Sequence, residues 1–191
     1  MLSRTKNVYV LHDVYVVYFT CMLYDVGAVR GVTQLGDIIY VVCVHSSIIK
    51  TFTDILCPLA DIHVEGMSPS DIVASHDDRH LYVADIRQCI WRISVDDHRY
   101  VKWLSTDVTT LSVTSRRLLV TSSYPAQLRE YSTIDKRLLR VVPLPWYVYH
   151  GVETTRGTFV VCHSSPRGTG WRCSRDRRPA SQYAVSELCS W

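Results

Sequence analysis

The chain has 191 residues, of which 47% are hydrophobic and 20% are charged, so it is long enough for one domain with a sizeable core and differs in composition from a disordered protein. The formal net charge of +3 gives no reason by itself to expect a nucleic-acid partner. The 12 Tyr residues, with abundant Val and Ile, favour strands over helices.

The first predicted element is a strand in the N-terminal segment, residues 1–30, which could belong to an incomplete repeat unit. The run VYVVYF at 14–19 is typical of a strand that is buried on both faces. His12 and Asp13 interrupt the apolar residues before it, which makes the segment too polar and too short for a membrane span and a poor signal peptide. We therefore expect no membrane interaction.

Cysteine and asparagine usage indicates the compartment. None of the seven Cys residues forms a C-x-x-C pair, so a zinc site lacks its usual spacing. Cys43, Cys89 and Cys162 lie in or beside apolar runs, which is typical of small buried residues in a reducing compartment. The only Asn, Asn7, is not part of an N-glycosylation sequon. These features predict a cytoplasmic protein.

From residue 31 onward, a hairpin pattern repeats along the chain. Four segments align on one valine each, with spacings of 42, 37 and 40 residues: Val41, Val83, Val120 and Val160. A period near 40 residues is typical of repeat architectures. Each unit contains short apolar runs separated by tight polar turns, as expected for four antiparallel strands. The runs are β-branched and lack helical spacing, which excludes a solenoid of helix pairs.

The predicted fold is therefore all-β, a β-propeller built of four-stranded antiparallel blades. An immunoglobulin-like sandwich is the alternative, because its strands are equally short, but it does not require four units to match. The expected blades span about 31–66, 67–105, 106–145 and 146–191.

The second unit carries a family resemblance. Residues 68–96, SPSDIVASHDDRHLYVADIRQCIWRISVD, resemble an NHL repeat; the match is partial in units one and three and weak in unit four. The resemblance implies a propeller that usually has six blades. Four units do not fill such a ring, so we expect a partial propeller, such as a fragment of a six-bladed ring, or else a small closed ring.

The fourth unit departs from the others. An Arg-rich stretch at about 167–182 predicts a loop insertion, or a sequence that has diverged from the blade pattern. With an insertion, YAVSEL at 183–188 is the predicted third strand of the blade. On this interpretation the sequence stops at Trp191 before a fourth strand. Open propeller edges expose unpaired strands, so we also expect self-association.

The loops after the aligned valines supply the predicted binding site. They are expected on one face, where they would present a polar and aromatic surface made of His45, Arg87, Tyr124 and His163. Asp85 belongs to the same loops, although it could instead cap the backbone amides of its own loop. These observations favour a non-catalytic scaffold that binds a protein or peptide; the alternative is that the residues are ordinary solvated turns.

Binding of single-stranded RNA is a second possibility, since some NHL propellers hold RNA on a basic face. The candidate phosphate contacts are Arg116-Arg117, Lys136-Arg137 and the Arg-rich residues 167–178. They come from different turns, and the aromatic side chains that would stack on bases are not evident beyond Tyr124.

A third possibility, a calcium-dependent lactonase or esterase, follows from the resemblance of NHL propellers to gluconolactonase-like enzymes. That resemblance implies a calcium site of Glu, Asn and Asp side chains, and Asn7 lies outside the repeats. The polar cluster at 76–80 falls in a predicted surface turn, and no motif for a nucleophile or a phosphate loop is present. We therefore expect no metal, no cofactor and no enzymatic activity.

Overall fold

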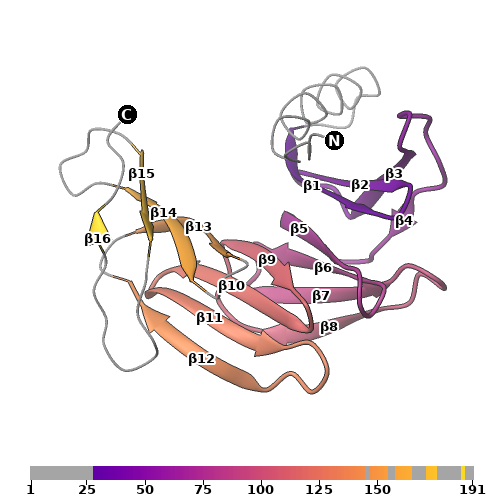
Figure 1. Ribbon diagram of the computed structural model, residues 1–191. Coiled ribbons are helices and arrows are strands. Elements are labelled where there is room, and N and C mark those ends of the chain that lie inside the picture. Colours follow the sequence, from indigo (N-terminus) through magenta and orange to yellow (C-terminus); the bar gives the residue numbers. More distant parts are fainter. Residues whose placement is uncertain (1–27, 145–146, 155–157, 165–170, 176–185, 188–191) are drawn as a thin grey trace, which may run out of the picture.

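The fold consists of four antiparallel sheets, each made of four consecutive strands (Figure 1). The computed structural model describes residues 28–144, 147–154, 158–164, 171–175 and 186–187. Within these ranges, no helix is long and apolar enough to cross a membrane.

The strands follow one another in chain order within each sheet. The first sheet contains β1 (Val29–Leu35), β2 (Ile38–Cys43), β3 (Ile48–Thr53) and β4 (Ile62–His63). The second contains β5 (Pro69–Ser75), β6 (His80–Asp85), β7 (Cys89–Ser94) and β8 (Tyr100–Ser105). The third contains β9 (Thr110–Thr114), β10 (Arg117–Ser123), β11 (Ala126–Ser132) and β12 (Leu138–Pro143). The fourth contains β13 (Val148–Glu153), β14 (Phe159–Ser164), β15 (Trp171–Arg175) and β16 (Ser186–Glu187).

The first strand of each sheet packs against the first strand of the next, so β1, β5, β9 and β13 form the inner wall of an arc (Figure 1). Side chains link these strands: Thr33 Oγ1 accepts from the backbone N–H of Ala74, and Ser112 Oγ donates to the carbonyl oxygen of Gly151. Among the described residues, the first and fourth sheets do not contact each other. The sheets are therefore arranged like propeller blades, and the described part of the ring is open.

The hydrophobic core consists of layers between neighbouring sheets. In β6, Leu81 and Val83 pack toward the first sheet, while Tyr82 and Ala84 pack toward the third sheet. All four side chains are buried, because a strand with neighbours on both sides has no solvent-facing side. This explains why the central strands β2, β6 and β10 are nearly continuous apolar runs and do not alternate between apolar and polar residues.

The prediction of a propeller of four-stranded blades is confirmed. Val41, Val83, Val120 and Val160 lie in β2, β6, β10 and β14, which are the second strands of successive sheets. The repeat period is therefore the number of residues along the chain from one sheet to the next, as expected for blades. A sandwich would instead have combined strands from different units into two sheets.

The register of the fourth unit is one residue away from the predicted alignment. Val83 and Val120 pack toward the preceding sheet, and in β14 the residue that does so is Val161, which packs with Leu119. Val160 therefore belongs to the other face of its sheet, since neighbouring strand residues point in opposite directions. The run TFVVC holds two successive valines, and sequence alone did not identify the equivalent one.

The last sheet also corrects the predicted insertion. Trp171–Arg175, inside the predicted insertion at 167–182, forms β15 and pairs with β14. Ser186–Glu187, from the run predicted as the third strand, forms β16 and is the fourth strand. The predicted N-terminal strand at 14–19 lies outside the described residues, and the first sheet begins at Val29.

Candidate functional site

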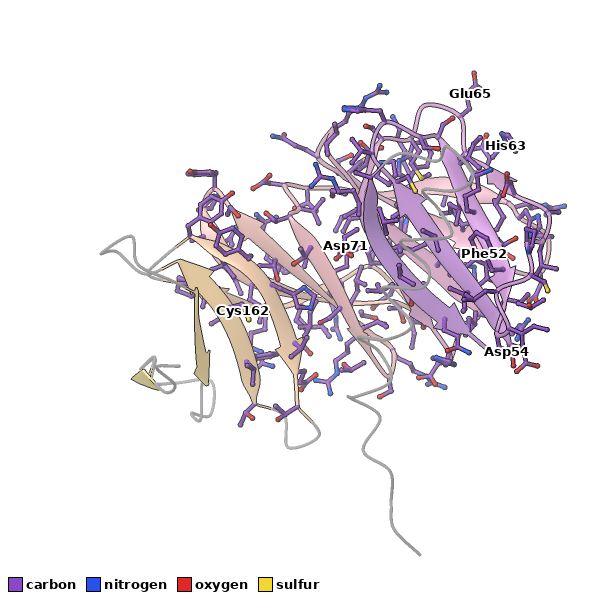
Figure 2. The ribbon with its side chains drawn as sticks, turned by 90° about the horizontal axis from the view of Figure 1, so that it is seen from above. Phe52, Asp54, His63, Glu65, Asp71 and Cys162 are labelled. Atoms are coloured by element: carbon purple, nitrogen blue, oxygen red, sulfur yellow. The ribbon has the colours of Figure 1, made fainter. Side chains whose placement is uncertain are left out.

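The two ends of the sheets form two different faces. Because the inner strands run in the same direction, turns of one kind lie at the same end of every sheet. Figure 2 shows both ends of the first sheet, with Asp54 at one end and His63 and Glu65 at the other. We call the end that includes Glu65 the loop face; its described loops are 44–47, 64–68, 86–88, 106–109, 124–125 and 147. The end that includes Asp54 is the opposite face.

Three of the predicted site residues lie on the loop face. His45, Arg87 and Tyr124 are exposed in the turns β2–β3, β6–β7 and β10–β11. Arg87 Nη1 donates to the carbonyl oxygen of Gly66 at 2.9 Å, which ties its turn to the connection between the first two sheets. His163 lies within β14, and its backbone is opposite Val148. These positions span the arc from the first sheet to the fourth.

Asp85, the fifth predicted site residue, is almost completely buried, with 1% of its surface exposed. Oδ1 accepts from the backbone N–H of Arg87 at 2.8 Å, and Oδ2 accepts from the backbone N–H of Ser68 at 2.9 Å and from Trp91 Nε1 at 2.8 Å. Three donors satisfy both carboxylate oxygens, so this geometry matches the capping interpretation. Asp85 fixes the turn that presents Arg87.

A cluster of three tyrosines on the loop face was not predicted. The ring centroids of Tyr124 and Tyr147 are 5.4 Å apart, and those of Tyr147 and Tyr149 are 5.0 Å apart, both in edge-to-face geometry. Tyr124 is 77% exposed and Tyr147 is 37% exposed. The cluster joins the β10–β11 turn of the third sheet to the start of the fourth sheet. The alternation of tyrosines in WYVYH was the available sequence signal.

A second cation lies on the loop face between the second and third sheets. Arg129, in β11, donates from Nη1 to Thr106 Oγ1 and from Nη2 to Ser122 Oγ at 3.4 Å. Thr106 belongs to the connection between these sheets, and Ser122 precedes the turn that carries Tyr124. The loop face thus combines exposed aromatic rings with arginines that are held by hydrogen bonds to the scaffold.

The RNA-binding candidates lie on the opposite face. Arg116-Arg117 and Lys136-Arg137 come from the β9–β10 and β11–β12 turns, which share one end of the third sheet. Arg117 Nη1 lies 2.8 Å from Glu130 Oε1, so this positive charge is already paired. Of the third candidate stretch, 167–178, only 171–175 is described. The basic turns and the tyrosine cluster therefore occupy different ends of the fold.

Two titratable groups occupy equivalent positions on inner strands. Asp71 in β5 and His150 in β13 each follow a β-bulge. Burial raises the pKa of Asp71 to about 6, although the backbone N–H groups of Leu111 and Ile72 favour its carboxylate form. Burial lowers the pKa of His150. Within the described ranges, no three His, Cys, Asp or Glu side chains are grouped closely enough to hold a metal ion.

Comparisons with known proteins report on the fold. No family model and no curated protein matches the chain. A solved structure of Kuenenia stuttgartiensis hydrazine synthase has a TM-score of 0.61 and 16% identity, covering 77% of this chain and 49% of that chain. The computationally designed Ika4 protein has a TM-score of 0.57 and 10% identity, covering 77% of this chain and 90% of that chain. The chain thus spans about half the length of the hydrazine synthase chain, and such low identities show the fold alone.

Proposed function

We propose that the chain is a non-catalytic scaffold that binds a protein or peptide partner through its loop face. The observation that carries the proposal is the cluster of Tyr124, Tyr147 and Tyr149. Tyrosines offer a large and rigid contact area with a polar tip, and they are enriched at interfaces and at the residues that dominate binding energy. Tyr124 is the most exposed ring of the cluster and is the expected anchor.

Other residues of the loop face support the same proposal. Arg87 and His45 are exposed on the same face as the tyrosines, in turns of the second and first sheets. Polar and cationic residues around an aromatic centre are typical of an interface rim. The hydrogen bonds of Asp85 hold the Arg87 turn in place, and rigid loops lose less conformational entropy when they bind.

Panning a library of displayed random peptides against the immobilised chain tests the proposal. We expect one family of related peptides to be enriched on the wild type and lost on the double variant Arg87→Gln/Tyr124→Ala. The matched control is Lys136→Gln/Ile55→Ala on the opposite face, because Ile55 and Tyr124 are both 77% exposed. If no family is enriched, or if the loop-face variant retains the family, the proposal is wrong.

A further inference from the structure

A cavity of about 400 Å³ lies on the opposite face, at the junction of the second and third sheets. Three turns and one strand supply its walls: the β5–β6, β9–β10 and β11–β12 turns and strand β7. The backbone N–H of Thr133 donates to the carbonyl oxygen of Arg116 at 3.0 Å, which joins two of these turns. The lining residues are Asp77, Asp78, Arg92, Arg116, Thr133 and Ile134.

The charges in this cavity are balanced and only partly paired, since Arg92 Nη2 lies 4.0 Å from Asp78 Oδ2 in an ion pair. Two carboxylates and two guanidinium groups line it, so the lining has no net charge. The side chains of Asp77 and Arg116 make no hydrogen bond or ion pair with any residue in the described part of the chain, and are not paired with each other. A free carboxylate and a free guanidinium therefore border one cavity from two different sheets.

Asp78 and Arg92, the other two charged lining residues, contribute buried polar atoms to the cavity. Asp78 Oδ2 accepts from the hydroxyl group of Tyr82 at 2.9 Å, whereas Asp78 Oδ1 and Arg92 Nε have no hydrogen-bond partner among the described residues. Both atoms are covered, so Asp77 and Arg116 are the groups that a ligand would contact first. A buried acceptor and a buried donor without partners are destabilising, and a ligand or ordered water in the cavity would satisfy them.

We propose that this cavity binds a small zwitterion of the amino-acid class. Its ammonium group pairs with Asp77 and its carboxylate pairs with Arg116, which accepts carboxylates in a planar fork geometry. An apolar side chain of the ligand packs on Ile134, which is 70% exposed at the edge of the cavity. A simple anion or a simple cation would satisfy only one of the two free charges.

The test is a titration with L-leucine. Binding is measured by calorimetry and, separately, by the change in the amide chemical shifts of Arg116 and Thr133. Contacts with two charges at an open site predict a Kd of about 1 mM. We expect N-acetyl-leucine, which lacks the ammonium group, and leucinamide, which lacks the carboxylate, each to bind roughly tenfold more weakly. Shifts at these amides on leucine addition support the site.

Variants separate the two contacts. Asp77→Asn and Arg116→Gln should each weaken leucine binding roughly tenfold without changing the melting temperature, because both side chains lie in turns and are exposed. Asp97→Asn and Lys136→Gln, which remove charges on the same face outside the cavity, should leave binding unchanged. Absence of binding at 20-fold the expected Kd (about 20 mM), equal binding of the analogues, or unaffected variants would overturn the proposal. Peptide binding at the loop face does not depend on any of these results.

Discussion

The carboxylate of Asp71, on the inner strand of the second sheet, accepts a hydrogen bond at 2.7 Å from the backbone N–H of Leu111, on the inner strand of the third sheet. Its other oxygen accepts from the backbone N–H of Ile72 at 2.9 Å. One side chain therefore links two neighbouring blades at the inner wall of the arc, near the first sheet (Figure 2). The link places an ionisable group in a largely buried site, which gives it a measurable pH dependence.

Asp71 should make the stability of the chain depend on pH between about 4 and 6. Burial raises its pKa from 3.8 to about 6 in the folded chain, so the stability that it contributes is present below pH 4 and is lost as the pH rises through 6. We measure the difference in unfolding free energy between the wild type and Asp71→Asn. As the pH rises across this range, this difference should fall by up to about 3 kcal/mol. Urea unfolding at pH 4, 5, 6 and 7 measures it. Parallel pH curves for the two proteins would show that Asp71 titrates normally.

Asp85→Ala should strongly destabilise the fold. The variant leaves the backbone N–H groups of Ser68 and Arg87 and the indole N–H of Trp91 without their acceptor in a buried site. Unsatisfied buried donors cost about 1–3 kcal/mol each, so we expect a loss of at least about 3 kcal/mol in urea unfolding. The control Asp37→Ala, at the exposed β1–β2 turn, should change stability by less than about 0.5 kcal/mol. A stable Asp85→Ala protein would show that the carboxylate is not needed to hold its turn.

The blade architecture was predictable because it depends on short-range patterns that repeat. Apolar runs such as LYVA mark a strand, polar turns mark its end, and the period between Val41, Val83 and Val120 fixes the order of the sheets. The register of the fourth sheet was not predictable, since both Val160 and Val161 fit the pattern. Only packing against Leu119 of the third sheet distinguishes them.

The candidate site was predictable in part. The topology rule that equivalent turns share one end of a propeller identified Arg87 and Tyr124, which the structure places on the loop face. Tyr147 and Tyr149 follow Tyr124 by more than 20 residues in the chain, and their ring contacts depend on how the third and fourth sheets are oriented. The alternation in WYVYH places Tyr147 and Tyr149 close together, but no local pattern shows that they meet Tyr124.

Gly31→Ala should weaken the packing between the inner strands of the first and second blades. A Cβ atom at this position would lie 2.8 Å from the backbone nitrogen of Ile72 and 3.0 Å from Asp71 Oδ1. Because a strand backbone cannot move aside as a flexible side chain does, we expect a loss of about 2 kcal/mol in unfolding free energy. Denaturant unfolding measures the loss. A variant as stable as the wild type would mean that the inner strands β1 and β5 are less closely packed than described.

Single-stranded RNA should bind weakly, if at all, at physiological salt. Arg117 is paired with Glu130, and the exposed rings of Tyr124 and Tyr147 lie at the other end of the fold from the basic turns. Fluorescence anisotropy with a labelled oligonucleotide at several salt concentrations measures this interaction. Tight binding that falls steeply with salt and is abolished by charge reversal at Arg116 and Lys136 would favour the RNA-binding alternative.

The most direct test of the loop-face proposal is to measure affinity and stability together in one double variant. The ligand is the peptide enriched on the wild type, and the variant is Arg87→Gln/Tyr124→Ala. Both side chains are exposed, so the melting temperature should remain within a few degrees of the wild type, corresponding to about 0.5 kcal/mol. The Kd should rise by at least about 30-fold, as expected when an aromatic anchor worth about 2 kcal/mol is removed. An unchanged Kd in a variant that remains folded would contradict the proposal, and so would a variant that unfolds, because the two residues would then be structural.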